Sequence, residues 1–318
     1  MSELNVAVVG CGGMGDVHLA RWSEVSGARI AAVCDIDTVS ATRAAAQFGA
    51  EAHTDWRALV DSAGLDIIDI CTPPNLHRDI AIAALDRGLH VLCEKPLART
   101  SAEAREMVGK AEENGRMLMT AFCHRFHPPV LFAKDLIEND DLGRIVMFRS
   151  RFSGSFPGIE GQWFSDPEIS GGGALLDTGV HSIDLFRYLV GEVTSASGKS
   201  ATVNPKLHVE DCAVATLQSE GGALGVVETS WSTPGGRNVL ELYGTAGACI
   251  IDYESNQVRY KTADMAVWDT REIAGPDRFQ CEILHFADAV RGLQPLLSSG
   301  HDGLRAIEIV EEILTTAT

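Results

Sequence analysis

Basic residues are scarce in this chain of 318 amino acids. Its 26 lysines and arginines stand against 44 aspartates and glutamates, so the net charge is −18 when histidine is counted as neutral. A surface that acidic repels phosphate backbones and anionic lipid headgroups. The sequence therefore predicts no nucleic-acid partner and no membrane partner, and it disfavours polyanionic substrates.

Long apolar runs and closely spaced cysteine pairs are also absent from the sequence. It contains no run of 18 apolar residues, and its N-terminus lacks a basic stretch followed by an apolar signal core. The eight cysteines show no CxxC spacing, and four of them lie in or at the end of apolar, strand-like runs: Cys34, Cys71, Cys93 and Cys249. Buried free thiols are typical of a reducing compartment, so we expect a cytoplasmic protein.

A glycine-rich turn follows the first apolar run, LNVAVV, which is typical of a buried parallel strand. The next residues, GCGGMG, fit the G-x-G-x-x-G template and lead into an expected helix. In a dinucleotide fold Gly10 permits the tight turn, Gly12 lets a pyrophosphate approach, and Gly15 allows helix–strand packing. The helix start supplies N–H groups for the phosphates. The phosphate-binding residues predicted in this turn are Gly10, Gly12, Gly13 and Met14.

The second expected strand, residues 29–34, ends at Asp35, 20 residues beyond Gly15. A carboxylate at this position can accept hydrogen bonds from both hydroxyls of an adenosine ribose, and it would repel a 2′-phosphate. Residues 36–40 contain no lysine or arginine. We therefore expect NAD as the cofactor, with NADP as the less favoured alternative.

Strands and helices continue to alternate up to residue 122. Strands are expected over 66–71, 90–93 and 117–122, and helices over 38–48, 56–62, 76–87 and 101–114, the last with Ser101 as its N-cap. This alternation predicts an α/β domain over residues 1–122, with a doubly wound parallel sheet of the Rossmann type. Ligands bind such sheets at the carboxyl ends of the strands. Gly10, Asp35, Thr72 and Lys95 all follow strand ends, so we expect them to border one site.

The pattern changes after residue 122. A helix is expected over 127–139, and residues 145–152 begin strand-like alternation. Seven strand candidates then follow one another between residues 193 and 273, mostly separated by Gly, Asn or Asp, and helices over 279–291 and 303–315 end the chain. Successive strands without intervening helices predict a large, mostly antiparallel sheet. We therefore expect an α+β domain over residues 123–318.

The stretch Gly171–Asp184 reads GGGALLDTGVHSID, and its apolar spacing predicts an amphipathic helix. On such a helix Asp177 and His181 are four residues apart and share one face. A carboxylate and an imidazole placed in this way can act as an orienting group and a general base. The alternative is a purely structural helix whose histidine is satisfied in the core. A metal site at Asp177, His181 and Asp184 would need a further ligand from elsewhere, and we predict no metal.

Together these motifs resemble those of the Gfo/Idh/MocA family, named after glucose–fructose oxidoreductase, inositol dehydrogenase and a rhizopine-catabolism protein. The resemblance rests on the glycine turn, the Thr72-Pro73 loop, Glu94-Lys95-Pro96 and the GGG-x3-D-x3-H-x2-D pattern, and it spans essentially the whole chain. It implies nicotinamide-dependent oxidation or reduction of a hydroxyl or carbonyl on a sugar, a sugar derivative or a cyclitol. It also implies a homo-oligomer, a dimer or a tetramer, in which another subunit covers the open face of the second sheet.

The resemblance also implies roles for individual residues. Lys95 matches the family's catalytic lysine, His181 its general acid/base, and Asp177 the carboxylate that hydrogen-bonds the substrate. The Lys95–Pro96 bond is often cis in the family. Positions that match the cofactor site near the nicotinamide are Thr72, Pro73, Asn75, His77, Glu94 and Lys95. Positions expected to contact substrate are Lys95, Arg125, Trp163, Asp177 and His181.

Two departures from the family pattern concern the substrate. Many members have arginine where this chain has Phe164, and asparagine or arginine is frequent where it has His124. Both positions bear on substrate choice, so the particular substrate stays open. Two alternative functions also stay open: an NAD-dependent glycosidase or lyase that oxidises its substrate transiently, and a non-catalytic NAD-binding regulator on the same fold.

Overall fold

The computed structural model describes residues 3–316, and the chain divides into two compact units. The first unit holds the residues up to Cys123 together with Asp277–Arg305. The second holds His124–Pro276 together with the residues from Ala306 onwards. The first change of unit lies one residue from the boundary predicted at 122/123. Residues 277–305, which the prediction assigned to the second domain, are part of the first unit.

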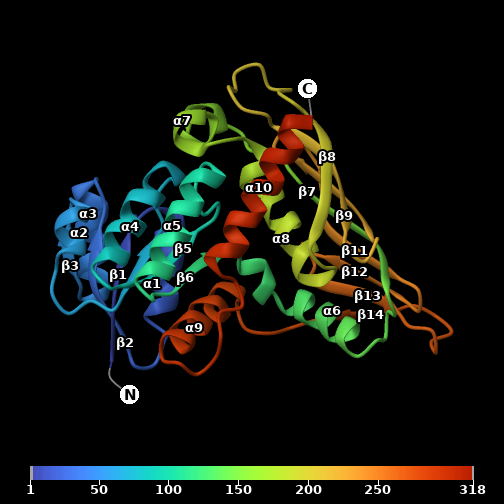
Figure 1. The fold of residues 1–318 in the computed structure, drawn as a ribbon, viewed down its shortest axis with the longest axis horizontal. Coiled ribbons are helices and arrows are strands. Elements are labelled where there is room, and N and C mark those ends of the chain that lie inside the picture. The colour runs from blue at the N-terminus through green and yellow to red at the C-terminus, as the bar shows by residue number, and fades with distance from the viewer. Residues whose placement is uncertain (1–2, 317–318) are drawn as a thin grey trace. The chain divides into compact units, whose positions relative to one another are not determined.

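The first unit is built on a six-stranded sheet in the order β3-β2-β1-β4-β5-β6, with every strand parallel to its neighbours (Figure 1). The strands are β1 (Leu4–Val9), β2 (Ala28–Cys34), β3 (Glu51–His53), β4 (Ile67–Ile70), β5 (His90–Glu94) and β6 (Leu118–Ala121). The strand order reverses at β1, between β2 and β4, where doubly wound folds bind dinucleotides. This confirms the predicted Rossmann architecture. Strand β3 was not predicted, because its three residues are mostly exposed and carry no apolar pattern.

Helices link the strands of this sheet. They are α1 (Gly13–Trp22), α2 (Thr38–Phe48), α3 (Trp56–Val60), α4 (His77–Asp86) and α5 (Ser101–Glu113). Helix α9 (Arg278–Val290) belongs to the same unit but follows β14 in the chain. The predicted N-cap of α5, Ser101, is wrong by one residue. Thr100 has the extended conformation of an N-cap, and its hydroxyl accepts the N–H of Glu103 at 3.2 Å. Helix α9 packs against α1.

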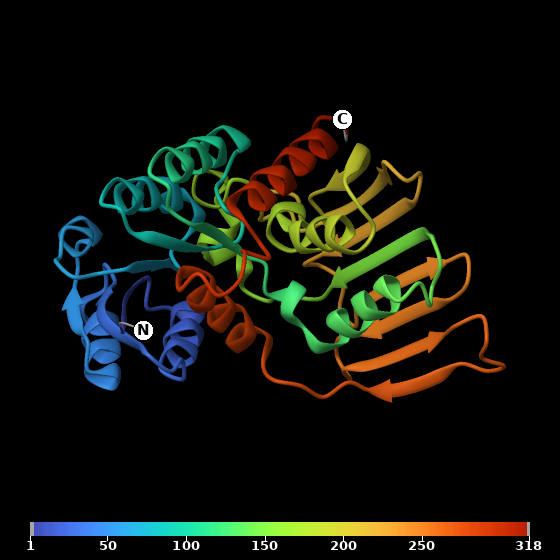
Figure 2. The ribbon, with the colours of Figure 1, turned by 60° about the horizontal axis from the view of Figure 1, so that its bottom comes forward.

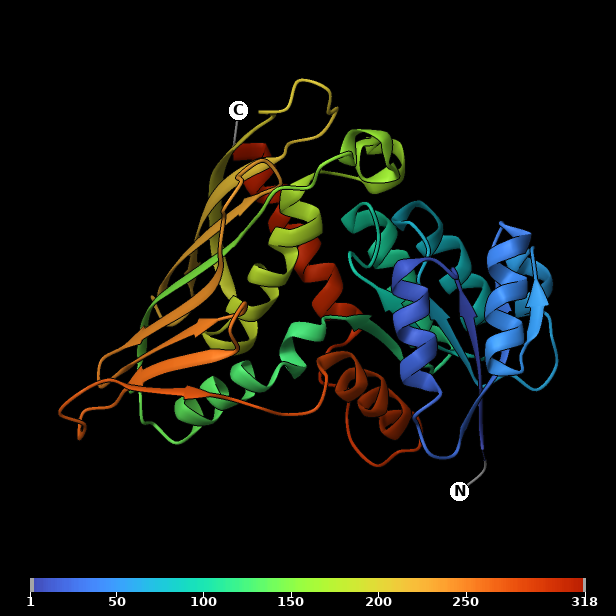
Figure 3. The same cartoon turned by 180° about the vertical axis from the view of Figure 1, so that it is seen from behind.

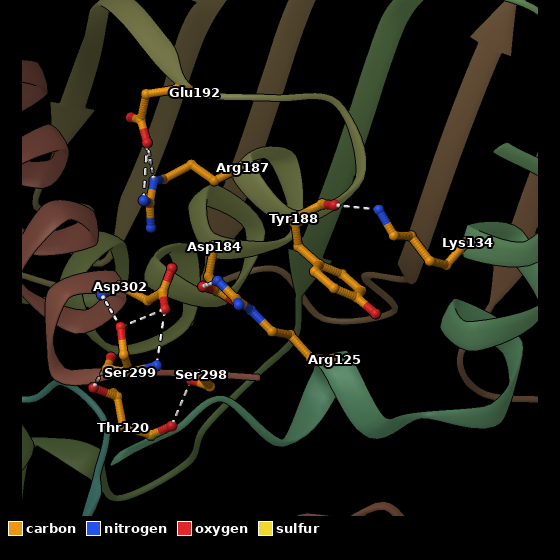
Figure 4. Close-up of polar contacts among 10 residues, drawn as sticks. All are labelled: Thr120, Arg125, Lys134, Asp184, Arg187, Tyr188, Glu192, Ser298, Ser299 and Asp302. Carbon is orange, nitrogen blue, oxygen red and sulfur yellow. Dashed lines mark hydrogen bonds and ion pairs between the residues drawn. The ribbon is translucent and has the colours of Figure 1, made fainter. Parts of the chain in front are cut away.

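The free edge of β6 is covered by residues just before α10 (Gly300–Thr316). Thr120 N–H donates to the carbonyl of Ser298 at 3.3 Å, and the Ser298 hydroxyl donates to the carbonyl of Thr120 at 2.7 Å (Figure 4). The Asp302 carboxylate then accepts both the amide and the hydroxyl hydrogen of Ser299, each at 2.8 Å. This cap explains why α10 begins at Gly300 rather than at the predicted Gly303.

The second unit is built on an eight-stranded sheet in the order β14-β13-β12-β11-β7-β10-β9-β8 (Figure 2). Only the β7–β10 pair is parallel, so the predicted mostly antiparallel sheet is confirmed. The strands are β7 (Ile145–Ser153), β8 (Val193–Ala201), β9 (Cys212–Ser219), β10 (Leu224–Ser230), β11 (Asn238–Gly244), β12 (Ala248–Asp252), β13 (Gln257–Lys261) and β14 (Asp269–Glu272).

Helices cover one face of this sheet. Helices α6 (Pro128–Glu138) and α8 (Val180–Leu189) lie on that face with the later part of α10 (Figures 1 and 3). Phe148 of β7 meets Phe186 of α8 edge to face at 5.3 Å between ring centroids. A Cβ on Gly225 of β10 would lie 2.7 Å from the same ring, so glycine is needed there. Among the described residues of this unit, no helix covers the opposite face.

Candidate functional site

The glycine turn joins β1 to α1, and its four glycines fall into two pairs. Gly10 has a φ of +99°, and an added Cβ would lie 2.6 Å from the Cys71 carbonyl oxygen. A Cβ on Gly15 would lie 1.9 Å from the Gly10 carbonyl oxygen. The protein's own backbone therefore requires these two glycines. A Cβ on Gly12 or Gly13 would meet no atom within 4 Å, so the start of α1 leaves the room that a pyrophosphate needs.

Asp35 lies directly after β2 and connects that strand to the glycine turn. Its Oδ2 accepts the N–H of Cys11 at 2.7 Å, and its Oδ1 accepts the N–H of Asp37 at 2.8 Å. Each carboxylate oxygen can accept more than one hydrogen bond, so capacity remains for ribose hydroxyls. Arg43, one turn into α2, donates to the Cys11 carbonyl at 3.0 Å and to Asp16 at 2.9 Å. Sequence reasoning missed this cation because it searched only residues 36–40.

The loop after β4 carries two side-chain oxygens that suit a ligand. The hydroxyl of Thr72 and the amide oxygen of Asn75 are buried and have no hydrogen-bond partner among residues 3–316. Buried polar atoms in a folded protein are nearly always hydrogen-bonded. A bound dinucleotide would supply hydroxyl and amide donors to such atoms. Together with the open start of α1, they show that the residues present fit the predicted cofactor.

His77 ties this loop to the one after β5. Its Nδ1 lies 3.0 Å from the carbonyl oxygen of Pro96, and its Nε2 lies 2.8 Å from that of Thr72. Burial lowers the pKa of His77, so the ring is neutral and donates to one of the two carbonyls. In this structure His77 therefore supports the loops through their backbone. The direct cofactor contact expected of it stays a prediction.

Lys95 follows β5 and is partly buried. The Lys95–Pro96 peptide bond is cis, as the resemblance implied. The backbone N–H of Lys95 donates to Oε2 of Glu94 at 2.9 Å, while Oε1 of Glu94 lies 3.1 Å from Nε2 of His18. Sequence reasoning missed His18. It lies three residues after the glycine turn on the buried face of α1, and nothing local in the sequence connects it to Glu94.

The Asp177–His181 segment is helical, but its first turn is not an α-helix. Residues Leu175–Gly179 form a turn of π-helix, and α8 begins only at Val180. The wider turn changes the angular spacing of Asp177 and His181 that the prediction took from 3.6 residues per turn. Such π turns are frequent at functional sites.

Glu210 occupies the space that the triple glycine leaves. Its carboxylate accepts the N–H groups of Gly173 at 3.0 Å and Leu175 at 3.1 Å, and its carbonyl accepts that of Ala174 at 2.8 Å. A Cβ on Gly173 would lie 1.8 Å from the Glu210 carbonyl oxygen. The backbone of Glu210 therefore makes the close approach that Gly173 permits. Sequence reasoning missed Glu210, because nothing local connects it to the motif.

A row of aromatic and polar side chains leads from Trp163 to Asp177. Trp163 stacks on Phe164 with ring centroids 3.7 Å apart, and Phe164 meets Trp231 edge to face at 6.4 Å. The indole N–H of Trp231 donates to the Thr178 hydroxyl oxygen at 3.3 Å. That hydroxyl in turn donates to Oδ2 of Asp177 at 3.0 Å. Two residues predicted to contact substrate are therefore linked through the fold of the second unit.

His181 is buried beside a second histidine. Its ring centroid lies 4.3 Å from that of His124, which also meets Phe152 at 5.1 Å and Tyr253 at 5.2 Å. Tyr253 stacks on His127 at 4.9 Å. The sequence singled out position 124 as a departure from the family, and the structure places it in ring contact with the predicted acid/base.

Arg125 and Asp184 form a buried, two-pronged ion pair (Figure 4). Nε of Arg125 donates to Oδ2 of Asp184 at 2.9 Å, and Nη2 donates to Oδ1 at 2.6 Å. The guanidinium carbon lies 5.1 Å from the ring centroid of Tyr188. Asp184, which the sequence analysis considered with Asp177 and His181 as a possible metal ligand, is thus paired with Arg125. Substrate contact by Arg125 stays a prediction.

The parallel sheet with a glycine turn at its switch point defines a nucleotide-binding Rossmann domain, and the chain also holds a second, mostly antiparallel sheet. The family model for an oxidoreductase family with an NAD-binding Rossmann fold matches residues 4–122, and the model for the GFO/IDH/MocA C-terminal domain matches residues 130–250. The chain belongs to this Gfo/Idh/MocA family of oxidoreductases.

Several relatives share both domains. Levoglucosan dehydrogenase of Pseudarthrobacter phenanthrenivorans is 32% identical over 80% of this chain and 75% of that protein. Inositol 2-dehydrogenase 2 of Saccharopolyspora erythraea is 34% identical over 77% of this chain and 72% of that protein. A solved structure of levoglucosan dehydrogenase with NADH and levoglucosan superposes with a TM-score of 0.94 at 29% identity, covering 99% and 97% of the two chains. The chain is thus similar to dehydrogenases of a sugar derivative and of a cyclitol.

Proposed function

We propose that this enzyme transfers a hydride between NAD and a carbon of a sugar, a sugar derivative or a cyclitol, oxidising a hydroxyl or reducing the corresponding carbonyl. The observation that carries the proposal is the glycine turn, in which two glycines are fixed by backbone contacts and two leave the helix start open. It lies in a chain whose relatives over both domains are named as dehydrogenases of such compounds. NAD, when bound, supplies the hydride acceptor.

The cofactor is assigned to the first unit. The amides of Gly12, Gly13 and Met14 at the start of α1 would hold the pyrophosphate. Asp35 would accept the adenosine ribose hydroxyls, which favours NAD over NADP. The residues proposed for the nicotinamide end are Thr72, Pro73, Asn75, His77, Glu94 and Lys95.

Lys95 and His181 are assigned to the proton transfer that accompanies hydride transfer. In the oxidative direction His181 takes the hydroxyl proton as general base, and Lys95 hydrogen-bonds the same oxygen and stabilises its developing negative charge. Asp177 positions the substrate. Arg125 and Trp163 are the further substrate residues that we propose. In the reductive direction Lys95 or His181 returns the proton to the carbonyl oxygen.

A cofactor-reduction screen across sugars and cyclitols tests this proposal. We expect NADH to form with at least one compound. We expect Lys95→Met and His181→Ala each to lower kcat by at least about tenfold while NAD affinity stays nearly unchanged, because both groups act in the chemical step. Lys110→Met and His301→Ala, which alter surface ion pairs, serve as controls and should match the wild type. Full activity of either site variant would remove that residue from the mechanism, and substrate turnover without net NADH would instead support the glycosidase or lyase alternative.

We also propose a homo-oligomer, a dimer or a tetramer, that uses the uncovered face of the eight-stranded sheet. Met147 of β7 and Leu224 of β10 are register partners, and they are 46% and 52% exposed. Val214 of β9 is 51% exposed. A second subunit on this face would remove these side chains from water.

A cytoplasmic location is proposed on the cysteines. All eight are free, and burial raises the pKa values of Cys11, Cys34 and Cys249 to about 12, so these thiols are unreactive. Free cysteines persist in reducing compartments. None of the helices in residues 3–316 is long and apolar enough to cross a membrane.

A further inference from the structure

A buried ionic cluster lies next to Lys95 in the first unit. His18 of α1 and Asp69 of β4 have no exposed surface, and Glu94 of β5 is 7% exposed. Nδ1 of His18 lies 2.8 Å from Oδ2 of Asp69, and its Nε2 lies 3.1 Å from Oε1 of Glu94. The indole N–H of Trp22 donates to the same Asp69 oxygen at 2.7 Å. Helix α1 and two neighbouring strands thus meet through charged side chains.

The His18 ring in this cluster is a cation. Both ring nitrogens face carboxylate oxygens, and both can donate only if the imidazole is protonated. Burial has the largest single effect on the pKa of His18 and lowers it, but the charge and hydrogen bond of Asp69, with further contributions from Cys71, together raise this pKa well above its ordinary value. Burial likewise works against ionisation of Glu94, yet the hydrogen bond and charge of His18, with help from Lys95, hold the pKa of Glu94 below its usual range. The cluster therefore holds one positive and two negative charges.

Stability alone does not explain such a cluster. Taking ions out of water is costly, and replacing a buried ionic group by apolar side chains is often neutral or stabilising. The function of the cluster is indicated by the partner of the second Glu94 carboxylate oxygen, Oε2. Oε1 of Glu94 is held by His18, and Oε2 accepts the backbone N–H of Lys95 at 2.9 Å.

We propose that His18, oriented by Asp69, is a positioning residue for the reaction: it fixes the Glu94 carboxylate, which holds the backbone of Lys95 and keeps a negative charge beside its ammonium group. The inference rests on the role proposed above for Lys95. As a positioning residue, His18 touches neither the substrate nor the reacting atoms. It acts through Glu94.

A metal ion is the competing explanation for these residues. Ligand atoms of His18, Asp69 and Cys71 lie within 4.8 Å of one another. Two ligands of a tetrahedral zinc ion, each about 2.0–2.1 Å from the metal, are separated by about 3.3 Å. The 2.8 Å between His18 and Asp69 is a hydrogen-bond distance instead. Burial also raises the pKa of Cys71, so its sulfur is a neutral thiol rather than a thiolate ligand.

Glu282 of α9 borders the same cluster without adding to its charge. It is fully buried, and burial together with the nearby Glu94 raises its pKa well above its ordinary value. The burial of Glu282 therefore favours the neutral, protonated form of its carboxyl. The charged groups that face His18 are thus Asp69 and Glu94.

The charge of His18 has a direct test that needs no substrate. In the protein without cofactor at about pH 7.5, NMR of ring-labelled histidine should show both nitrogens of His18 protonated. His90, at the other end of β5, is the internal control, because burial lowers its pKa and its ring should be neutral. A ring without a proton on Nε2 would overturn the proposal, because it could not donate to Glu94.

Two substitutions separate the two contacts of His18. An asparagine amide falls near the position of Nδ1, so His18→Asn keeps a donor for Asp69 and loses Glu94. A glutamine amide falls near Nε2, so His18→Gln keeps a donor for Glu94. We expect kcat to fall about tenfold or more in His18→Asn and to stay within about threefold of wild type in His18→Gln, with KM and NAD affinity nearly unchanged in both. His90→Asn, a matched control on β5, should leave kcat unchanged.

A double-mutant cycle decides whether His18 acts through Lys95. In a Lys95→Met background, His18→Asn should lower the residual kcat by less than about twofold, because the group it positions is already gone. A second tenfold loss, or full kcat in His18→Asn alone, would overturn the proposal. If thermal melting shows that His18→Asn does not fold, Asp69→Asn replaces it with the same expectations. Full activity of Lys95→Met would instead refute the proposed function, whatever His18 does.

Discussion

Glu282 is the residue at which burial and charge conflict most directly. Neither of its carboxylate oxygens has a hydrogen-bond partner among the described residues. Burial raises its pKa well above the ordinary value, with further contributions from Glu94 and Asp69 that His18 and Arg278 partly offset. In the unfolded chain the group ionises near its ordinary value. Between those two pKa values the folded state holds the extra proton, so stability falls as pH rises through this interval.

Glu282→Gln removes this titration and keeps the shape of the side chain. We expect the variant to melt at a higher temperature than the wild type at about pH 8. Its free energy of unfolding should be larger by up to about 1.4 kcal/mol for each pH unit of the interval, and this difference should shrink towards about pH 5. Thermal unfolding followed across this pH range measures the effect. The exposed Glu254→Gln is the control. A difference of equal size at both ends of the range would show that ionisation of Glu282 is not its cause.

The sequence did not predict site residues whose contact partners are far away in the chain. Gly10, Gly12 and Gly15 could be found because their spacing is local and each has a separate steric reason. His18 could not, since its partners Asp69 and Glu94 are 51 and 76 positions away. The local sequence around a histidine on the buried face of a helix does not indicate that two carboxylates contact it.

Among the elements, the π-helical turn over Leu175–Gly179 differs most from its prediction. The apolar spacing correctly predicted a helix through Asp177 and His181, because period alone reveals a buried face. It could not reveal the wider turn, which coincides with backbone hydrogen bonds to Glu210 from a loop 35 positions beyond Leu175. Such hydrogen bonds belong to tertiary structure and leave no trace in local periodicity.

Thr178 in this turn offers a test of how Asp177 is held. Thr178→Val keeps the side-chain shape but removes both the acceptor for Trp231 and the donor to Asp177. We expect KM for the sugar or cyclitol to rise about fivefold, the effect of about 1 kcal/mol, with NAD affinity unchanged. Steady-state kinetics and a cofactor titration measure the two quantities. Thr216→Val, on an exposed position of β9, is the matched control, and an unchanged KM in Thr178→Val would show that this hydroxyl does not position Asp177.

At the scale of the whole molecule, the sequence predicted both sheets but not which residues complete the first unit. Alternation of strands and helices revealed the Rossmann sheet, and successive strands revealed the second sheet. The return of residues 277–305 to the first unit was missed, because an amphipathic helix such as α9 shows that it covers a core without showing which core. Its partner α1 lies more than 250 positions earlier in the chain.

The uncovered face of the eight-stranded sheet predicts how assembly should respond to charge. Leu224→Glu places a carboxylate among the exposed apolar side chains of this face, so we expect subunit association to weaken by about a hundredfold, or about 2.7 kcal/mol. Sedimentation or light scattering at several concentrations measures the change. Val39→Glu, on an exposed apolar position of α2, should not alter assembly. A monomeric wild type, or an unaffected Leu224→Glu oligomer, would refute this interface.

The divided first unit has a consequence for synthesis of the protein. Helix α9 and the segment that covers the edge of β6 come after residue 276, so a ribosome has made most of the chain before the cofactor-binding unit can close. Until then the edge of β6 in the nascent Rossmann sheet has no partner, and the surface of α1 that α9 will cover is exposed to solvent. Truncated chains that end near residue 123 should therefore expose an unpaired strand edge and the uncovered surface of α1. We expect chaperones to bind them, even though they contain every residue that we assign to NAD.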